Sequence, residues 1–287
     1  MNPLRKQFNA DPAFPFSIMH RDLKNYRTEL PDHLHDWYEI VYVHSGRGVF
    51  FIDQTIYDMH AGDLFVIPGN TIHRSFPDRD EPVTSTAVFF SPVLIQPSSL
   101  GESFSYLRCF ELGRARKSFK LDCTDSLREG IEALVDRIDV EMKEQKPGFR
   151  HAIMLVVHQL LLLINRETAA GSRMGESSDA APDWMKNLLL YIDQRFCEPI
   201  GLAELAVHAA VSPAHLSRLF KQLTGMTVTG FIAAKRLIRA KELLLQTGDG
   251  VGQIAAACGF ESLPHFHRSF KRFAGMTPAA YRRSGAG

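Results

Sequence analysis

The chain has 287 residues, enough for two domains that each bury a core, and its 45% hydrophobic and 23% charged content is ordinary for a soluble globular protein. Its net charge of +1 hides an asymmetry. Residues 183–287 carry 13 Lys and Arg against 7 Asp and Glu, whereas the remainder carries 20 against 25. A basic carboxy-terminal third on an acidic remainder predicts a polyanion-binding module joined to a domain of another kind.

The cysteines and the hydropathy pattern exclude several classes of protein. Four scattered cysteines without a CxxC pair argue against disulfides and Cys-type zinc sites: Cys109, Cys123, Cys197 and Cys258. Residues 1–11 lack the apolar core of a signal peptide, and the most apolar run, 152–164, is too short to cross a bilayer. We therefore expect a cytoplasmic protein with no membrane partner.

The first part of the chain has the pattern of short strands. Runs rich in β-branched and aromatic residues alternate with Gly and Pro turns, and they predict strands at 39–43, 48–52, 63–67 and 84–90. Closely spaced strands of this kind favour a sandwich or a barrel. Near Ser126 the apolar spacing becomes helical, and two helices separated by Pro147-Gly148 predict an αα-hairpin over 126–167. Residues 168–182 are small and polar and predict a flexible linker.

The last third is predicted to be wholly helical and internally repeated. The expected helices span 184–195, 201–208, 213–223, 228–246, 251–257, 263–273 and 278–282. Phe220-Lys221 is followed by Gly225-Met226-Thr227, and Phe270-Lys271 by Gly275-Met276-Thr277. Each copy has a short helix, a tight turn and a second helix with basic residues. Two such copies predict two DNA-reading modules in series, whereas a single basic helix would indicate only a solvated face.

The second helix of each copy supplies the candidate DNA contacts. Arg218 and Arg268 are the best base readers, because a guanidinium can pair bidentately with guanine. His215, Ser217, His265 and His267 can add contacts on the same faces. Further along the two helices, the expected phosphate contacts are Lys221, Lys271 and Arg272. The intervening helix 228–246 is long enough to separate two modules that read consecutive turns, about 34 Å apart, of one DNA face.

The run from Ile200 to Arg283 resembles the AraC/XylS family of bacterial transcription regulators. The resemblance covers about a third of the chain and implies a seven-helix domain with two helix-turn-helix modules. It supports Ala214, Ser217 and Arg218 in the first recognition helix. In the second it supports Leu263, Pro264, His265, His267 and Arg268. Leu263 and Pro264 replace residues that are polar in many relatives, so readout there is expected to be apolar, for example to a thymine methyl.

A second group of residues lies in the strand-rich part. His33 and His35 point the same way on a strand, Glu39 keeps that parity, and His73 from a neighbouring strand completes the set. Three imidazoles and a carboxylate suit Zn, Fe, Ni or Mn. The spacing resembles the metal motif of the cupin barrel, although Asn70 stands where that motif often has Gly. The alternative is that these histidines shape a ligand pocket or link strands without a metal, so no cofactor is certain.

We expect the strand-rich domain to bind a small effector, a sugar or a related polar metabolite. The candidate effector residues are His33, His35, Trp37, Tyr38, Glu39, Tyr42, Arg47 and His73. Its aromatic members would stack on a sugar ring if they faced the barrel, and otherwise belong to the core. The resemblance also implies that the hairpin dimerises. Leu155, Leu162 and Leu163 are the candidate homodimer contacts, with packing on the barrel as the alternative.

These observations predict an α+β protein with four parts. They are a cupin-like effector-binding domain (1–125), a dimerisation hairpin (126–167), a linker (168–182) and a double helix-turn-helix domain (183–287). The predicted function is that of a ligand-responsive regulator that binds promoter DNA and is not an enzyme. Activation of carbohydrate or related catabolic genes through RNA polymerase is the family default. The alternatives are a metal-dependent cupin enzyme fused to a DNA-binding domain and a constitutive regulator whose cupin is a scaffold.

Overall fold

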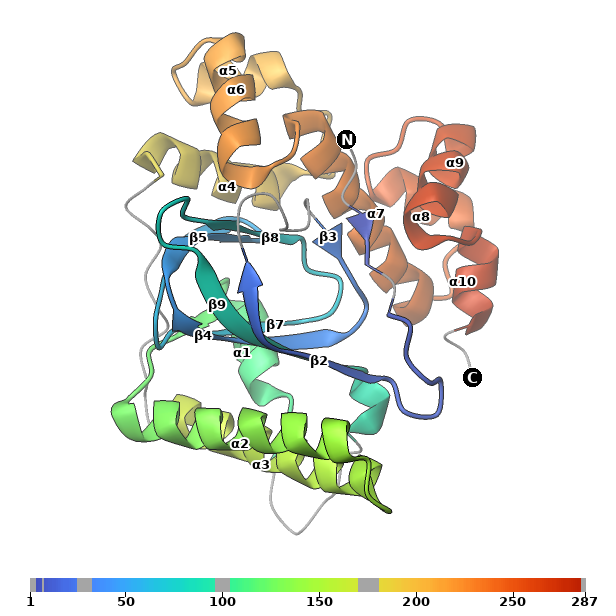
Figure 1. Cartoon of the computed structure of the whole chain (residues 1–287). Helices are drawn as coiled ribbons and strands as arrows, with labels where there is room; N and C mark the ends of the chain where they lie inside the picture. Colours follow the sequence, from blue (N-terminus) through green and yellow to red (C-terminus); the bar gives the residue numbers. More distant parts are fainter. Residues whose placement is uncertain (1–3, 7, 25–32, 96–103, 170–180, 285–287) are drawn as a thin grey trace. The chain divides into compact units, whose positions relative to one another are not determined.

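The computed structural model describes residues 4–6, 8–24, 33–95, 104–169 and 181–284 (Figure 1). These divide into two compact units. One consists of 7–30 and 35–180, and the other of 1–6, 31–34 and 181–287. Most of the predicted linker, residues 170–180, lies outside the described residues. Of the described helices, none combines the length and the apolar character needed to cross a membrane.

The first unit is built on antiparallel strands, as predicted. One sheet has the order β10–β7–β4–β9–β2. Its strands are β2 (Phe16–Lys24), β4 (Tyr38–Ser45), β7 (Leu64–Ile67), β9 (Val83–Phe90) and β10 (Lys120–Leu121). Facing it, β5 (Arg47–Ile52) pairs with both β6 (Thr55–His60) and β8 (His73–Pro77). The β5–β6 hairpin turns at Asp53, which has φ 57°, a conformation that Asp tolerates better than most residues.

Strand β4 shows how side-chain alternation divides this unit into two cores. Val41 and Val43 point between the two sheets and pack with Phe50, Phe65 and Phe89. Ile40 and Tyr42 point to the opposite face, where they join the apolar sides of the helices. Glu39 therefore lies on the inner face of the sheet, whereas its neighbour Tyr38 lies on the outer face.

Three helices cover that outer face: α1 (Arg108–Arg116), α2 (Asp125–Glu144) and α3 (Phe149–Ala169). Helices α2 and α3 run alongside each other beneath the sheet (Figure 1) and form the predicted hairpin. The apolar run of α3 is explained largely by this packing, because its buried side chains all belong to the same core: Ile153, Val156, Val157, Leu160, Leu161 and Ile164. The sequence did not predict α1, nor the short 3-10 turn Pro92–Leu94.

The second unit contains seven helices among its described residues, each within one or two residues of its predicted bounds. They are α4 (Asp183–Arg195), α5 (Leu202–His208), α6 (Pro213–Thr224), α7 (Val228–Gln246), α8 (Val251–Ala257), α9 (Leu263–Ala274) and α10 (Pro278–Ser284). Two short parallel strands, β1 (Leu4–Arg5) and β3 (His33–Leu34), are grouped with them. Arg5 donates from Nη1 to the carbonyl of Ala274 in α9.

The duplicated Gly-Met-Thr sequence ends one helix and starts the next. Gly225 and Gly275 adopt φ of 82° and 76° after α6 and α9, a left-handed conformation that favours glycine. The hydroxyl of Thr227 then accepts the amide of Gly230 at 3.2 Å, and that of Thr277 accepts the amide of Ala280 at 3.3 Å. The repeat therefore encodes the same turn and N-cap twice, which places both recognition helices in equivalent local frames.

Candidate functional sites

The first recognition helix, α6, divides cleanly into a buried and an open face. Ser212 accepts the amide of His215 at its start, and Leu216 and Phe220 are fully buried. Ala214, Arg218 and Lys221 are exposed, and His215 and Ser217 are half-buried. The candidate DNA contacts of this helix therefore lie away from its apolar face.

The second recognition helix, α9, divides in the same way. Phe266, Phe270 and Phe273 form its buried face. The candidate contacts on this helix are all exposed: Leu263, Pro264, His265, His267, Arg268, Lys271 and Arg272. The three inward phenylalanines thus leave open a face that is apolar at its first two residues and polar or basic beyond them.

The two readers differ in how their side chains are supported. In α6, the Nη2 atom of Arg218 lies 3.3 Å from Nδ1 of His215, and the ring of His215 lies 5.8 Å from that of Trp184 in α4. In α9, His265 lies 5.9 Å from Phe260 in the preceding turn. The two recognition helices have equivalent caps and turns, but the side chains on their exposed faces differ in type and in the neighbours that support them.

The basic residues of α7 are used largely within the helical unit. Lys235 and Lys241 are only 7% and 2% exposed, and Lys235 forms an ion pair with Asp193. Arg236 donates to backbone carbonyls, and Arg239 pairs with Glu242 at 3.1 Å. The positive balance read from the sequence therefore overstates the charge that this unit presents to a polyanion, because part of it is neutralised or buried in α7.

In the strand-rich unit, two histidines converge on one carboxylate. Nε2 of His35 and Nε2 of His73 each lie 3.0 Å from the same oxygen, Oε2 of Glu39. All three side chains are buried, and the two imidazole rings lie 5.1 Å apart. Glu39 lies at the start of β4, His35 lies between β3 and β4, and His73 begins β8. The structure thus brings the predicted set together, since ligand atoms of His33, His35 and His73 lie within 4.8 Å of one another and Glu39 contacts two of these rings.

The second nitrogen of each ring determines what this group can bind. Nδ1 of His35 lies 2.8 Å from the carbonyl of Trp37, and Nδ1 of His73 lies 2.9 Å from the carbonyl of Thr71. A carbonyl can only accept, so each Nδ1 donates its proton there and each Nε2 is left facing Glu39, where an Nε2–H would donate to the carboxylate and a deprotonated Nε2 would share a cation with it. A backbone carbonyl that orients the far nitrogen is the usual support of a metal-bound histidine. The arrangement therefore fits a divalent cation.

The charge of Glu39 depends strongly on the two histidines beside it. Burial alone would raise the pKa of Glu39, but the two adjacent histidines outweigh it and hold that pKa well below its usual range. A buried carboxylate that stays ionised needs positive charge beside it, either an imidazolium or a cation. The fourth predicted ligand, His33, is 5% exposed and lies in β3, two residues before His35.

The remaining effector candidates lie in different places. Trp37 stacks on Phe8, with ring centroids 4.2 Å apart, at the edge of the inner core. Tyr42 faces outward and donates to Oε1 of Glu132 in α2 at 2.8 Å, and burial raises its pKa. Arg47 is exposed, with Asp78 and Glu81 within 3.7 Å. Tyr42 and Arg47 therefore do not share a pocket with His35, Glu39 and His73.

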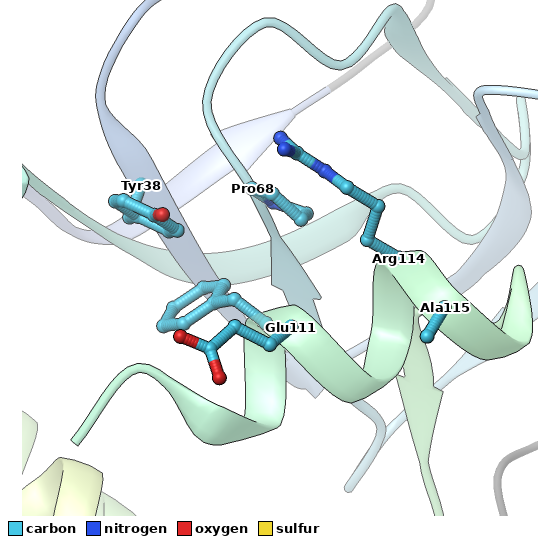
Figure 2. Close-up of a pocket in the computed structure, with 6 residues that line it drawn as sticks. Tyr38, Pro68, Glu111, Arg114 and Ala115 are labelled. Atoms are coloured by element: carbon cyan, nitrogen blue, oxygen red, sulfur yellow. The ribbon is translucent and has the colours of Figure 1, made fainter. Parts of the chain in front are cut away.

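A cavity of about 250 Å³ lies instead on the outer face of the sheet, beside α1 (Figure 2). It is lined by Tyr38, Pro68, Phe110, Glu111, Arg114 and Ala115. Tyr38 and Phe110 meet edge to face, 4.6 Å between centroids, and burial raises the pKa of Tyr38. Figure 2 shows Glu111 and Arg114 extending from successive turns of α1. Arg114 also donates from Nη2 to the carbonyl of Gly69 at 2.9 Å.

Of the residues that line this cavity, the sequence prediction contained Tyr38 but missed those on α1. The available signal was weak, because α1 has nine residues and its buried side chains are confined to Cys109 and Phe110 beside Gly113. So short an apolar pattern does not distinguish a helix from a buried strand.

Comparison with known families agrees with both parts of this description. Residues 17–161 match the model of the AraC-like ligand binding domain, and residues 205–284 match that of a helix-turn-helix domain. The chain belongs to the AraC family. As an AraC-family protein it is a DNA-binding transcription regulator with an amino-terminal cupin-like domain.

Relatives with assigned roles cover nearly the whole of this AraC-family chain. The HTH-type transcriptional activator RhaR of Mannheimia succiniciproducens is 24% identical over 90% of this chain and 89% of its own. The HTH-type transcriptional activator RhaS of Pectobacterium carotovorum is 24% identical over 89% of this chain and 88% of its own. The bifunctional transcriptional activator/DNA repair enzyme AdaA of Bacillus subtilis is 35% identical, but over only 39% of this chain and 54% of its own.

Proposed function

We propose that this AraC-family regulator reads two neighbouring major grooves of promoter DNA through α6 and α9, and that a small polar effector controls it. The observation that carries the first part is the split of both helices into an aromatic or aliphatic buried face and an open face with Arg218 or Arg268. A recognition helix needs that division, because one face must hold it to the domain while the other meets base edges. The outer residues differ between the helices, so the expected half-site is not palindromic.

Binding-site selection with single variants tests this reading. Arg218→Ala and Arg268→Ala should each cost about 1–3 kcal/mol at the cognate site and relax base preference in one subsite only. The matched control is Gln222→Ala, which removes an exposed neutral side chain from α6. Base preferences that are unchanged in both arginine variants would rule out these residues as readers.

For the effector, we propose the cavity between Tyr38 and α1. An aromatic face flanked by a carboxylate and a guanidinium suits a sugar or a related hydroxylated metabolite, because the ring can stack while the charged groups accept and donate hydrogen bonds to hydroxyls. The volume of about 250 Å³ is of the order of a single small metabolite. RhaR and RhaS are called transcriptional activators, which supports activation as the outcome here.

Calorimetric titration with a panel of sugars and polar metabolites tests the effector site. A ligand that binds the unaltered protein should bind Tyr38→Ala and Glu111→Gln at least tenfold more weakly, as expected when a stacking ring or a hydrogen-bonding group is lost. Glu129→Gln, on the exposed side of α2, is the control. Absence of binding across the panel would favour the constitutive regulator with a scaffold cupin.

The converging Nε2 atoms of His35 and His73 support a second proposal, a divalent metal held by these residues with Glu39 and His33. The donor set of nitrogen and carboxylate oxygen suits Zn, Fe, Ni or Mn. Metal analysis of protein purified without chelators should find about one ion per chain, and His73→Ala should abolish it. Stoichiometric metal together with turnover of a sugar would favour the enzyme alternative, whereas an equal metal content in His73→Ala would exclude this site.

We further propose that the hairpin forms a homodimer and that the bound regulator acts on RNA polymerase at carbohydrate or related catabolic promoters. Leu155 is 71% exposed on α3 and supports an intermolecular contact, whereas Leu163 packs against the core and near Gly130 of α2. Leu155→Glu should therefore convert a dimer to a monomer in sedimentation experiments. An unchanged mass would exclude this face.

A further inference from the structure

One arginine in the helical unit joins the segment that leads into the first helix-turn-helix module to the turn of the second. Arg236, in the middle of α7, donates from Nε to the carbonyl of Phe196 at 2.6 Å and from Nη2 to the carbonyl of Glu198 at 2.6 Å. Its Nη1 donates to the carbonyl of Gly259 at 2.8 Å. Three donors of one planar group therefore engage three backbone carbonyls.

The carbonyls come from two segments that lie far apart along the chain. Phe196 and Glu198 follow the last turn of α4, in the segment that leads into the first module, α5 and α6. Gly259 lies in the turn between α8 and α9, which is the turn of the second module. The carbonyl of Phe196, the C-cap residue of α4, lacks an intrahelical donor and carries partial negative charge, so a cation is well suited to hold it.

The turn of the second module approaches this segment too closely for any side chain but that of glycine. Gly259 has φ 80°, and a Cβ there would lie 2.3 Å from the carbonyl oxygen of Cys197 and 3.0 Å from Nε of Arg236. Backbone contact and guanidinium therefore meet at a single junction of α4, α7 and the α8–α9 turn, which we call the Arg236 junction.

We infer that Arg236 is a positioning residue that sets the second recognition helix relative to the first, and through it the spacing of the two subsites that the protein reads on DNA. The spacing part of the inference rests on the proposed two-groove reading. A guanidinium holds its donors in a rigid fork, so it can fix the directions of three carbonyls at once. A lysine keeps the charge but replaces the fork with a flexible point donor. The Arg236→Lys substitution therefore separates positioning from charge.

The first experiment measures the distance between the modules in the full-length protein without DNA. Spin-labelled amino acids are placed at Gln222 in α6 and Ala256 in α8, both exposed and outside the proposed DNA contacts. The unaltered protein should give one narrow distance distribution, and Arg236→Lys a broader one at unchanged helix content. Arg239→Lys, one turn away and paired with Glu242 on the surface, is the control and should stay narrow. A narrow distribution in Arg236→Lys would overturn the inference.

The second experiment varies the number of base pairs between the two selected subsites. The unaltered protein should prefer one spacing, and Arg236→Lys should lose about tenfold of that preference, the effect expected from losing one or two hydrogen bonds. Equal weakening at every spacing would overturn the assignment of Arg236 to spacing. If Arg236→Lys does not fold, Gly259→Ala perturbs the same junction with the cation retained and should give the same broadening. If the unaltered protein binds no DNA, the proposed function fails, while the distance distributions still decide the role of Arg236.

Discussion

Asn165 in α3 is expected to hold the start of α1, and with it the wall of the proposed effector cavity. Its Oδ1 accepts the amide of Cys109 at 2.8 Å, and its Nδ2 donates to the carbonyl of Tyr106 at 2.9 Å. The N-cap residue of α1, Leu107, makes no side-chain capping bond, so an amide from another helix performs that role. Asn165→Ala removes both links at a position that is 3% exposed.

The loss of stability in Asn165→Ala can be worked out from the hydrogen bonds that are removed and from the buried amide that loses its acceptor. Each lost hydrogen bond contributes about 0.5–1.5 kcal/mol, and the buried amide of Cys109 loses its partner, which adds to the penalty. The third bond, from Nδ2 to the carbonyl of Leu161, lies within α3 and adds little, because that carbonyl belongs to the helix. We therefore expect a loss of about 2–4 kcal/mol in the free energy of unfolding, roughly 5–15 °C in Tm for a unit of this size. Effector binding should weaken as well, because Phe110, Glu111 and Arg114 all lie on α1.

The two tryptophans allow the free energy of unfolding to be measured in one unit at a time. Trp37 lies in the strand-rich unit and Trp184 in the helical unit, so Trp184→Phe leaves a reporter of the former. Urea unfolding followed by Trp37 fluorescence should show the loss in Asn165→Ala. Gln159→Ala, an exposed amide on the same helix, should stay within about 0.5 kcal/mol of the parent protein. A loss in Asn165→Ala no larger than that in Gln159→Ala would refute the capping role.

Three further outcomes are expected. Lys271→Ala should weaken binding to all DNA sequences alike and reduce the salt slope by about one, as measured by fluorescence anisotropy across a salt series; a sequence-selective loss would instead make Lys271 a base reader. Thr227→Ala should cost about 1 kcal/mol in urea unfolding followed through Trp184, since its hydroxyl caps α7, and an effect near zero would contradict the capping role. Burial raises the pKa of Asp136, but hydrogen bonds from His20 and Arg21 outweigh it and lower that pKa below 3.8 in the folded protein. The ionised carboxylate therefore stabilises the folded state above that pH, and this stabilisation is lost as the pH falls through the folded pKa. In Asp136→Asn, the free energy of unfolding measured through Trp37 should therefore fall less steeply at acid pH. An unchanged dependence on pH would argue against a contribution of Asp136 to stability.

Local signals account for how closely the helical unit could be predicted. Ser212 and Ser262 cap the recognition helices, Gly225 and Gly275 end them, and the inward apolar residues follow the helical period. Each of these signals acts within a few residues and is repeated fifty residues later. The periodicity therefore predicted which side chains of α6 and α9 would be exposed, without any knowledge of the rest of the chain.

The strand-rich unit was predicted less completely, and the reason is visible in β4. The sequence predicts one effector site that contains Glu39, Tyr38 and Tyr42, although consecutive strand residues point to opposite faces. The structure places Glu39 with His35 and His73 inside, and Tyr38 and Tyr42 outside against the helices. The prediction for the inner group relied on parity and agrees with the structure, whereas the grouping with the tyrosines ignored it.

The sequence by itself determined the double helix-turn-helix, the open faces of its recognition helices and the histidine–carboxylate set, because caps, turns and side-chain periods depend on neighbours along the chain. Only the tertiary structure decided that α1 forms a wall of the cavity, that Lys235 and Lys241 are buried and that Arg236 bonds both the segment after α4 and the α8–α9 turn. Those roles depend on which carbonyls, carboxylates and rings from distant segments surround each side chain, and the spacing of residues in the sequence does not contain that information.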